Sequence, residues 1–460
     1  MNLEKIKYVY LLGAGGIGMS ALGRYFIKLG ISVSGYDKTS TNFTNELQAE
    51  GFDLNFSDLI ENIPFDVRNS SKEDLLVIHT PAVPSNNKQY NYLKDKGFKI
   101  HKRAEVLGLI SSRHKTIAVA GTHGKTTTSS LIAHLFYTAG LNPVAFLGGI
   151  AANYGTNFLA GGHQSIMIAE ADEFDRSFLH LHPSTAIVTS VDPDHLDIYG
   201  EEKELLKTFN DFVNLTPADG NIIIKAGLPF PQSIKERAIS YHTSAPADIQ
   251  LIHCKEESGY YHFGVRFKNQ TIDNLKLGQP GFHNVENALA AIGAALVNGI
   301  VEEALRTGLS SFKGVKRRFE YIIRTDDLIF IDDYAHHPEE LNACIRSVRA
   351  LYPDKKITGV FQPHLFSRTR DFYDDFALSL SLLDQVILLD IYPAREEPIP
   401  GVSSDILLEK IKLKERFLVA KESLPEFLLN QNPQVLLTLG AGDIDQLVEP
   451  IRKKLTFKSN

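Results

Sequence analysis

Residues 121–128 read G-T-H-G-K-T-T-T. They follow a short apolar run, Thr116 to Ala120, with the composition of a β-strand, and they open a helical stretch that ends near Gly140. A glycine-rich loop between a strand and a helix N-terminus binds phosphate, because its backbone N–H groups point toward the anion. We therefore expect a P-loop in which Lys125 reaches the terminal phosphates of a nucleotide. The hydroxyl of Thr126 or Thr127 would bind Mg²⁺.

The loop is two residues shorter than the common P-loop pattern. That pattern, G-x-x-x-x-G-K-[ST], places a glycine six residues before the lysine, where this chain has Val119. The first glycine stands at Gly121 instead, which separates this loop from those of GTPases and most ATPases. The competing interpretation is an ordinary turn rich in glycine and threonine before a helix.

Length and composition indicate a multidomain globular protein. With 460 residues the chain exceeds a single core, and its 43% apolar and 22% charged residues are ordinary values. The net charge of -7 gives no support for nucleic-acid or anionic-membrane partners, and no apolar run reaches membrane-spanning length. Only Cys254 and Cys344 occur, which favours a reducing compartment. We expect a cytoplasmic protein without stable membrane insertion.

Apolar strands and helical stretches alternate along the chain, which predicts an α/β fold. We expect three domains: residues 1–112 Rossmann-like, residues 113–313 P-loop ATPase-like, and residues 314–460 Rossmann-like. The central sheet would be mostly parallel, with antiparallel strands added from the alternating segment 248–277. The expected strands are Tyr8–Leu12, Ile31–Gly35, Leu75–Thr80, Thr116–Ala120, Ser165–Ala169, Thr185–Ser190, Leu328–Ile331, Ile357–Phe361, Gln385–Leu389 and Val435–Leu439. The expected helices include Ile17–Leu29, Glu202–Asn214, Val285–Asn298 and Glu339–Leu351.

A second glycine-rich turn occurs near the N-terminus. Residues 13–18 read G-A-G-G-I-G between a strand and a helix, and Asp37 lies 19 residues after Gly18. This pattern fits a ribose diphosphate, with Asp37 on a ribose hydroxyl. By itself it permits an NAD-dependent oxidoreductase, and it also permits a turn that only lets a helix pack closely on its strand.

Carboxylates follow two strands of the central segment. Residues 170–175 read E-A-D-E-F-D, and residues 192–197 read D-P-D-H-L-D. Carboxylates at strand ends beside a P-loop reach its Mg²⁺, and Glu170 is the best candidate. On spacing alone, His195 is as well explained by a structural role as by a second metal site.

Polar clusters also mark the start of a helix and the final segment. His283 and Asn287 are four residues apart at the start of an expected helix, where they could contact a base or serve only as surface and capping residues. Residues 316–318 read K-R-R, either a solvated charge run or a guanidinium for a phosphoryl group. Residues 332–338 and 362–370 each follow a strand, and we expect them on adjacent strands at one sheet edge.

Together these segments resemble the Mur ligase family over the whole chain. The shared segments, in the family's order, are GTHGKTTT, EADEFD, DPDHLDIYG, HNVENALAA, GVKRRFE, DDYAHHPEE, FQPHLFSRTRDFYDDF and LGAGD. Within the family, G-A-G-G-I-G-M-S and H-H-P are similar to the branch that adds L-alanine. The resemblance implies an ATP- and Mg²⁺-dependent amide-forming ligase that joins L-alanine to the carboxylate of UDP-N-acetylmuramate through an acyl phosphate.

The resemblance also implies a role for each matching residue. Lys125, His195 and Arg317 would be catalytic. UDP-sugar contacts would be Gly13, Gly15, Gly16, Gly18 and Asp37. ATP contacts would be Gly121, Thr122, His123, Gly124, Lys125, Thr126, Thr127, His283, Asn287, Arg317 and Asp333. Metal ligands would be Thr126, Glu170 and His195, and amino-acid contacts Tyr334, His336 and Arg368.

The chain departs from some relatives at one position. They read F-Q-P-H-R where this sequence has Leu365, so recognition of the alanine carboxylate would depend more on Arg368. No carbamylated lysine is expected in this branch, and the protein would be a monomer or weak homodimer. Two alternatives stay open beside the oxidoreductase: a recycling ligase that joins a ready-made peptide to the same UDP-sugar, and a nucleotide-gated binding protein.

Overall fold

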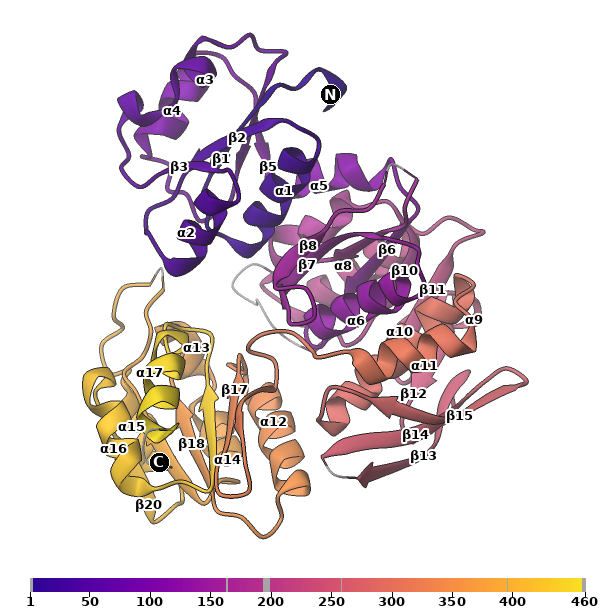
Figure 1. The fold of residues 1–460 in the computed structure, drawn as a ribbon, viewed down its shortest axis with the longest axis vertical. Helices are drawn as coiled ribbons and strands as arrows, with labels where there is room; N and C mark the ends of the chain where they lie inside the picture. The colour runs from indigo at the N-terminus through magenta and orange to yellow at the C-terminus, as the bar shows by residue number, and fades with distance from the viewer. Residues whose placement is uncertain (1–2, 163, 193–198, 258, 395, 457–460) are drawn as a thin grey trace. The chain divides into compact units, whose positions relative to one another are not determined.

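The computed structural model describes residues 3–162, 164–192, 199–257, 259–394 and 396–456. The chain forms two compact units. The first comprises Met1–Ile252, Gly264–Asp273 and Asn287–Leu309, and the second comprises His253–Phe263, Asn274–Glu286 and Ser310–Asn460. Figure 1 follows three sheets along the chain, from indigo through magenta to yellow. In the described part of the chain, no helix is both long and apolar enough to cross a membrane.

The N-terminal sheet has the order β3-β2-β1-β4-β5, with every pair parallel. Its strands are β1 (Tyr8–Leu12), β2 (Ser32–Tyr36), β3 (Asp53–Asn55), β4 (Leu75–His79) and β5 (Ile100–Lys102). Its helices are α1 (Ile17–Lys28), α2 (Asn42–Ala49), α3 (Phe65–Asn69), α4 (Lys88–Asp95) and α5 (Arg103–Ser111). The strand order reverses at β1, and in such sheets ligands bind beyond the carboxyl end of that strand.

The central sheet has the order β15-β14-β13-β12-β11-β10-β6-β9-β7-β8. Its strands are β6 (Thr116–Ala120), β7 (Val144–Ala151), β8 (Thr156–Leu159), β9 (Met167–Glu170), β10 (Pro183–Val188), β11 (Asn221–Lys225), β12 (Ile239–His242), β13 (Ile249–Glu257), β14 (Tyr260–Phe267) and β15 (Gln270–Leu277). Its helices are α6 (Lys125–Thr138), α8 (Glu202–Asn214), α9 (Gln232–Arg237), α10 (Phe282–Val297) and α11 (Glu302–Ser311). Two residues separate β14 from β15, and so short a connection joins antiparallel neighbours.

The C-terminal sheet has the order β16-β17-β21-β18-β19-β20, and β16 is its antiparallel strand. Its strands are β16 (Glu320–Arg324), β17 (Ile329–Asp333), β18 (Ile357–Phe361), β19 (Gln385–Leu388), β20 (Glu415–Leu418) and β21 (Val435–Leu439). Its helices are α12 (Pro338–Leu351), α13 (Phe366–Asp371), α14 (Tyr373–Leu380), α15 (Ser404–Lys410), α16 (Leu424–Gln431) and α17 (Asp445–Thr456).

The predicted α/β class with added antiparallel strands is confirmed. One prediction was wrong: β17 and β18 are not adjacent, because β21 lies between them and pairs in parallel with both. The strand that separates them comes about 75 residues later in the chain, so local sequence carries no sign of it. The clusters after β17 and β18 still lie at the same edge, because all three strands point the same way.

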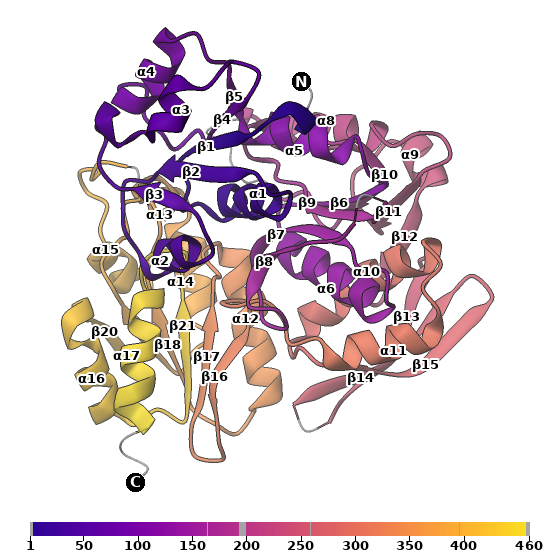
Figure 2. The ribbon, with the colours of Figure 1, turned by 45° about the horizontal axis from the view of Figure 1, so that its top comes forward.

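The N-terminal sheet and the central sheet share a hydrophobic core. Helix α1 packs against β7 and β8 (Figure 2), and its Tyr25 ring lies 5.6 Å from that of Phe146 and 6.2 Å from that of Phe158. The same core contains Val9 and Leu11 of β1 together with Met167 and Ala169 of β9. The two sheets of the first unit are therefore packed as one body.

A buried polar network adds to this packing. Arg24 of α1 donates from Nε and Nη2 to the two carboxylate oxygens of Glu50, both at 2.6 Å, and from Nη1 to Asn157 Oδ1. Asn157 of β8 is fully buried and donates to the Ile17 carbonyl at 2.6 Å and to Ser20 Oγ at 3.1 Å. Asn157 thus links β8 to the first turn of α1 and to the buried guanidinium of Arg24.

We expect Asn157→Ala to lower the stability of this unit by about 2–3 kcal/mol, because it removes the acceptor of the buried Arg24 Nη1 and the donor to Ile17 O and Ser20 Oγ. Thermal unfolding followed by circular dichroism measures the effect. Asn42→Ala, at an exposed position of α2, is the control and should change stability by less than about 0.5 kcal/mol. Equal midpoints for the two variants would contradict the role given to Asn157.

Candidate active site

The P-loop connects β6, buried along its whole length, to α6. Gly124 precedes the helix with φ 82°, and Gly121 has φ 133°, conformations that side chains other than glycine rarely adopt. A Cβ at Gly121 would collide with Thr189 Oγ1, and one at Gly124 would meet Asn287 Oδ1 at 2.5 Å. Glycine is therefore required at both positions, and Asn287 of α10 lies directly against the loop.

The residues after β10 fix the shape of the loop. Ser190 Oγ accepts the backbone N–H of His123 at 2.8 Å and lies 2.8 Å from Thr122 Oγ1. The backbone N–H of Asp192 donates to Thr122 Oγ1 at 3.0 Å. Strands β6 and β10 are parallel neighbours, so their carboxyl ends meet and these contacts follow from the pairing.

Lys125 lies inside the loop and forms a buried ion pair. Its Nζ donates to Gly121 O at 2.6 Å, to Thr122 O at 3.3 Å and to Glu173 Oε1 at 2.8 Å. Burial alone would lower the pKa of Lys125, but Glu173, Glu170 and Asp172 outweigh it and raise the pKa. The ammonium therefore stays charged at neutral pH. Burial raises the pKa of Glu173, against the attraction of Lys125.

Glu170 lines a hollow that the two sheets of the first unit share. It ends β9, opposite Val119 of β6, and its carboxylate lies over Gly148 of β7, where a Cβ would collide with it. The hollow is lined by Ile17, Gly18, Ala21, Arg103, Leu107, Phe146, Leu147, Gly148, Glu170 and Asp172. It thus contains the last glycine of the N-terminal turn together with the candidate metal carboxylate.

Arg103 was not predicted from the sequence, although it lies in this hollow. Its Nη2 donates to Asp172 Oδ2 at 3.1 Å, and its guanidinium covers Gly18 so closely that a Cβ there would collide with it. An arginine at this point gives the hollow a cationic group for an anionic ligand.

The N-terminal turn is organised as the glycine pattern indicates. Asp37, after β2, accepts the backbone N–H of Gly15 at 2.7 Å and that of Thr39 at 3.2 Å. A Cβ at Gly13 would collide with Thr80, which follows β4. Asp37 and the turn thus lie together at the carboxyl edge of the sheet, and the ribose contact expected for Asp37 stays a prediction.

Helix α10 carries the candidate base contacts. His283 and Asn287 are four positions apart, so they share a helix face. His283 Nδ1 lies 3.1 Å from Ser347 Oγ, and burial lowers the pKa of His283 to about 4, so this imidazole is neutral at pH 7.

Arg317 is held rigidly in the second unit. Its Nη2 donates to Gly440 O at 2.6 Å, its Nε to Asp332 Oδ2 at 3.3 Å, and its Nη1 lies 3.7 Å from Asp445. The guanidinium carbons of Arg317 and Arg318 lie 5.1 and 4.9 Å from the centre of the Tyr334 ring. Two guanidinium groups therefore lie on one aromatic ring, and carboxylates help to hold both in place.

Asp333 organises the backbone. Its Oδ2 accepts the N–H of Phe319 at 2.7 Å, and its Oδ1 accepts that of Ala335 at 2.7 Å. Burial raises the pKa of Asp333 to about 6, despite Arg318. These contacts give Asp333 a structural task beside the ribose contact expected for it, which stays a prediction.

The three predicted amino-acid contacts belong to one region. The centres of the Tyr334 and His336 rings are 5.2 Å apart. Arg368 is close enough to His336 for its positive charge to add to the effect of burial in lowering the pKa of this histidine. His336 Nδ1 lies 2.9 Å from the Tyr334 carbonyl, which can only accept, so Nδ1 carries the proton and Nε2 is an acceptor. Burial lowers the pKa of His336 to about 4. Leu365, before α13, has φ 70°, an unusual conformation for leucine.

His195 lies outside the described residues, so its expected metal contact stays a prediction.

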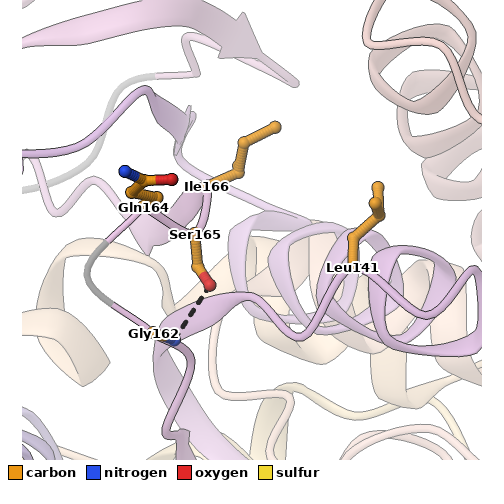
Figure 3. A pocket seen from close by; sticks show the side chains of 5 residues that line it. All are labelled: Leu141, Gly162, Gln164, Ser165 and Ile166. Atoms are coloured by element: carbon orange, nitrogen blue, oxygen red, sulfur yellow. Dashed lines mark hydrogen bonds between the residues drawn. The ribbon is translucent and has the colours of Figure 1, made fainter.

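Another hollow, lined by Leu141, Gly162, Gln164, Ser165 and Ile166, lies beyond the C-terminal end of α6 (Figure 3). It is therefore remote from the P-loop at the opposite end of that helix.

Comparison with known proteins identifies the family. The sequence matches the Mur ligase family catalytic domain over residues 8–115, the Mur ligase middle domain over 119–295, and the Mur ligase glutamate ligase domain over 317–442. It is 47% identical over 458 residues to the UDP-N-acetylmuramate–L-alanine ligase of Christiangramia forsetii, with 100% of both chains covered. The chain belongs to the Mur ligase family.

Other Mur ligases support the same assignment. The UDP-N-acetylmuramate–L-alanine ligase of Flavobacterium psychrophilum is 46% identical, again over 100% of both chains. The crystal structure of the UDP-N-acetylmuramate–alanine ligase from Thermotoga maritima superposes with a TM-score of 0.82 at 25% identity, covering 98% of this chain and 99% of that one. A murein peptide ligase from Psychrobacter arcticus has the same fold, with a TM-score of 0.70 at 22% identity and 98% of both chains covered.

We expect Lys125→Ala to abolish ATP-dependent activity and to destabilise this Mur ligase by about 3–5 kcal/mol, because it leaves Glu173 buried without its cation. The double variant Lys125→Met/Glu173→Gln should recover most of that stability and stay inactive. Urea unfolding and phosphate release measure the two effects. Turnover in a folded Lys125 variant, or equal stability of the single and double variants, would contradict this interpretation.

Proposed function

We propose that this Mur ligase is an ATP-dependent ligase that joins L-alanine to the carboxylate of UDP-N-acetylmuramate, a step in the synthesis of peptidoglycan precursors. The hollow that contains both Gly18 and Glu170 is the observation that carries the proposal. A UDP-sugar held at the N-terminal turn would extend its carboxylate toward the P-loop edge through this hollow. The full-length similarity to ligases named for this reaction supports the choice of substrates.

The reaction proceeds in two steps. A carboxylate oxygen of the sugar attacks the γ-phosphorus of ATP, the bond to the bridging oxygen breaks, and ADP leaves. The amine of alanine then attacks the acyl carbon, phosphate leaves with its bonding electrons, and the amine loses a proton. The first step brings two anions together, so cationic groups are needed to stabilise the transition state. We assign Lys125 and Arg317 to that task.

The residues present fit a Mg²⁺ site of the open kind found with nucleotides. Mg²⁺ takes one or two protein oxygens and completes its coordination with phosphates and water. Thr126 at the start of α6 and Glu170, for which Gly148 leaves room, would supply those oxygens. Among the described residues, no group of three or more His, Cys, Asp or Glu side chains is placed to hold a metal by itself. The ion would neutralise phosphate charge.

The neutral His336 fits the second substrate. With Nδ1 protonated, Nε2 can accept a hydrogen bond from the amine of alanine, and a pKa near 4 makes it an orienting acceptor at pH 7. Arg368 would bind the carboxylate of the same molecule, since guanidinium matches carboxylate geometry.

Both cysteines are thiols, which fits the reducing cytoplasm that we propose as the location of this protein.

Phosphate release tests the function. With ATP, Mg²⁺ and UDP-N-acetylmuramate, we expect turnover on adding L-alanine and none when Mg²⁺ or the UDP-sugar is omitted. A murein tripeptide in place of alanine is the comparison. Turnover with the tripeptide alone would make the protein a recycling ligase, and no turnover with either would overturn the proposal.

Arg368→Ala should raise the KM for L-alanine at least tenfold, because a charge-assisted bidentate contact is lost, while the KM for ATP stays nearly constant. Arg370→Ala, two residues along α13 on an exposed side chain paired with Asp371, is the matched control. An unchanged alanine KM in Arg368→Ala would assign carboxylate recognition to another residue.

A further inference from the structure

The P-loop lysine already has partners for all three of its N–H donors in this structure. Two are carbonyls of the loop itself, Gly121 and Thr122, and the third is the carboxylate of Glu173. The lysine side chain is 14% exposed. The ammonium therefore lies inside the loop that phosphates would enter, and a bound nucleotide would compete with these three acceptors for it.

Glu173 is fixed in position by its own backbone and neighbours. Its carbonyl accepts the Tyr199 hydroxyl at 2.5 Å and the Arg176 N–H at 2.9 Å. Asp175 and Arg176 both have φ 54°, and Asp175 Oδ2 accepts from Lys102 Nζ at 2.7 Å. Because the segment is held on both sides, the carboxylate cannot follow the lysine far.

The charge balance around Glu173 depends on Lys125. The Glu173 side chain is 1% exposed, and Glu173 Oε2 has no hydrogen-bond partner in the described part of the chain. A buried carboxylate without a cation is strongly unfavourable. The phosphates of ATP would both withdraw the cation and bring like charge close to this carboxylate.

We propose that Glu173 is a positioning residue that competes with the phosphates of ATP for Lys125. The ion pair keeps the lysine ordered in the nucleotide-free loop, and binding of ATP breaks it. Glu173 therefore weakens ATP binding, and the return of Lys125 to Glu173 favours release of ADP. This inference rests on the proposed function, since it requires ATP in the P-loop.

Calorimetric titration of full-length Glu173→Gln tests the competition. The amide keeps the shape and an acceptor but removes the charge, so Kd for a non-hydrolysable ATP analogue with Mg²⁺ should fall about tenfold. Kd for AMP, which lacks the β- and γ-phosphates that Lys125 would reach, should stay constant. Glu202→Gln, which removes a carboxylate at an exposed position of α8, is the control and should change neither value.

An unchanged or weaker affinity for the ATP analogue in Glu173→Gln would overturn the proposal. So would an equal change for AMP, which would indicate a merely structural role. Glu173→Asp provides a second variant if the amide fails to fold, because its shorter side chain withdraws the carboxylate from Lys125. Failure of the wild-type protein to bind the ATP analogue would instead refute the proposed function.

A structure of the wild-type protein with the ATP analogue gives an independent measurement. The distance from Lys125 Nζ to Glu173 Oε1, 2.8 Å here, should exceed ion-pair range when nucleotide is bound. If Lys125 contacts the phosphate and also keeps its bond to Glu173, the proposal that ATP displaces Lys125 from Glu173 is overturned.

Discussion

Parallel pairing of β6 with β9 on one side and β10 on the other is the constraint on which the P-loop site depends. It brings three chain segments to one sheet edge: the loop itself, Glu170 with Glu173, and Ser190 with Asp192. Each then has a defined task, because the loop would contact phosphate, the acidic segment holds its lysine, and the residues after β10 fix its shape. None of these contacts is local in sequence.

The sequence predicted what depends on local pattern. The bounds of β1, β6, β18, β21 and α8 agree with those expected, because short apolar runs between turns and an amphipathic helix are periodic signals. Glu173 and Arg103 could not be assigned, since their roles come from partners 48 and 69 residues away, Lys125 and Asp172. The insertion of β21 between β17 and β18 was missed for the same reason.

Polar residues at strand ends show a further limit of sequence reasoning. Asp332 and Asp333 are the last two residues of β17, and their order in the sequence does not distinguish their roles. In the structure Asp332 accepts from Thr438 and Arg317, whereas Asp333 accepts two backbone N–H groups. Burial raises the pKa of each carboxyl group to about 6, so the surrounding protein shifts the titration of both. Only the three-dimensional arrangement distinguishes a carboxylate that positions an arginine from one that shapes a turn.

The core that α1 shares with β7 and β8 fixes a distance within the first unit. The N-terminal turn and Glu170 stand at a separation set by close-packed aromatic rings and a buried arginine, and such packing deforms little. A UDP-sugar bound at the turn would have to span that fixed distance. Its carboxylate would align with the phosphate only if nucleotide, pyrophosphate and sugar together have the right span. Selectivity for the sugar would then arise partly from length, without a dedicated contact to every group along it.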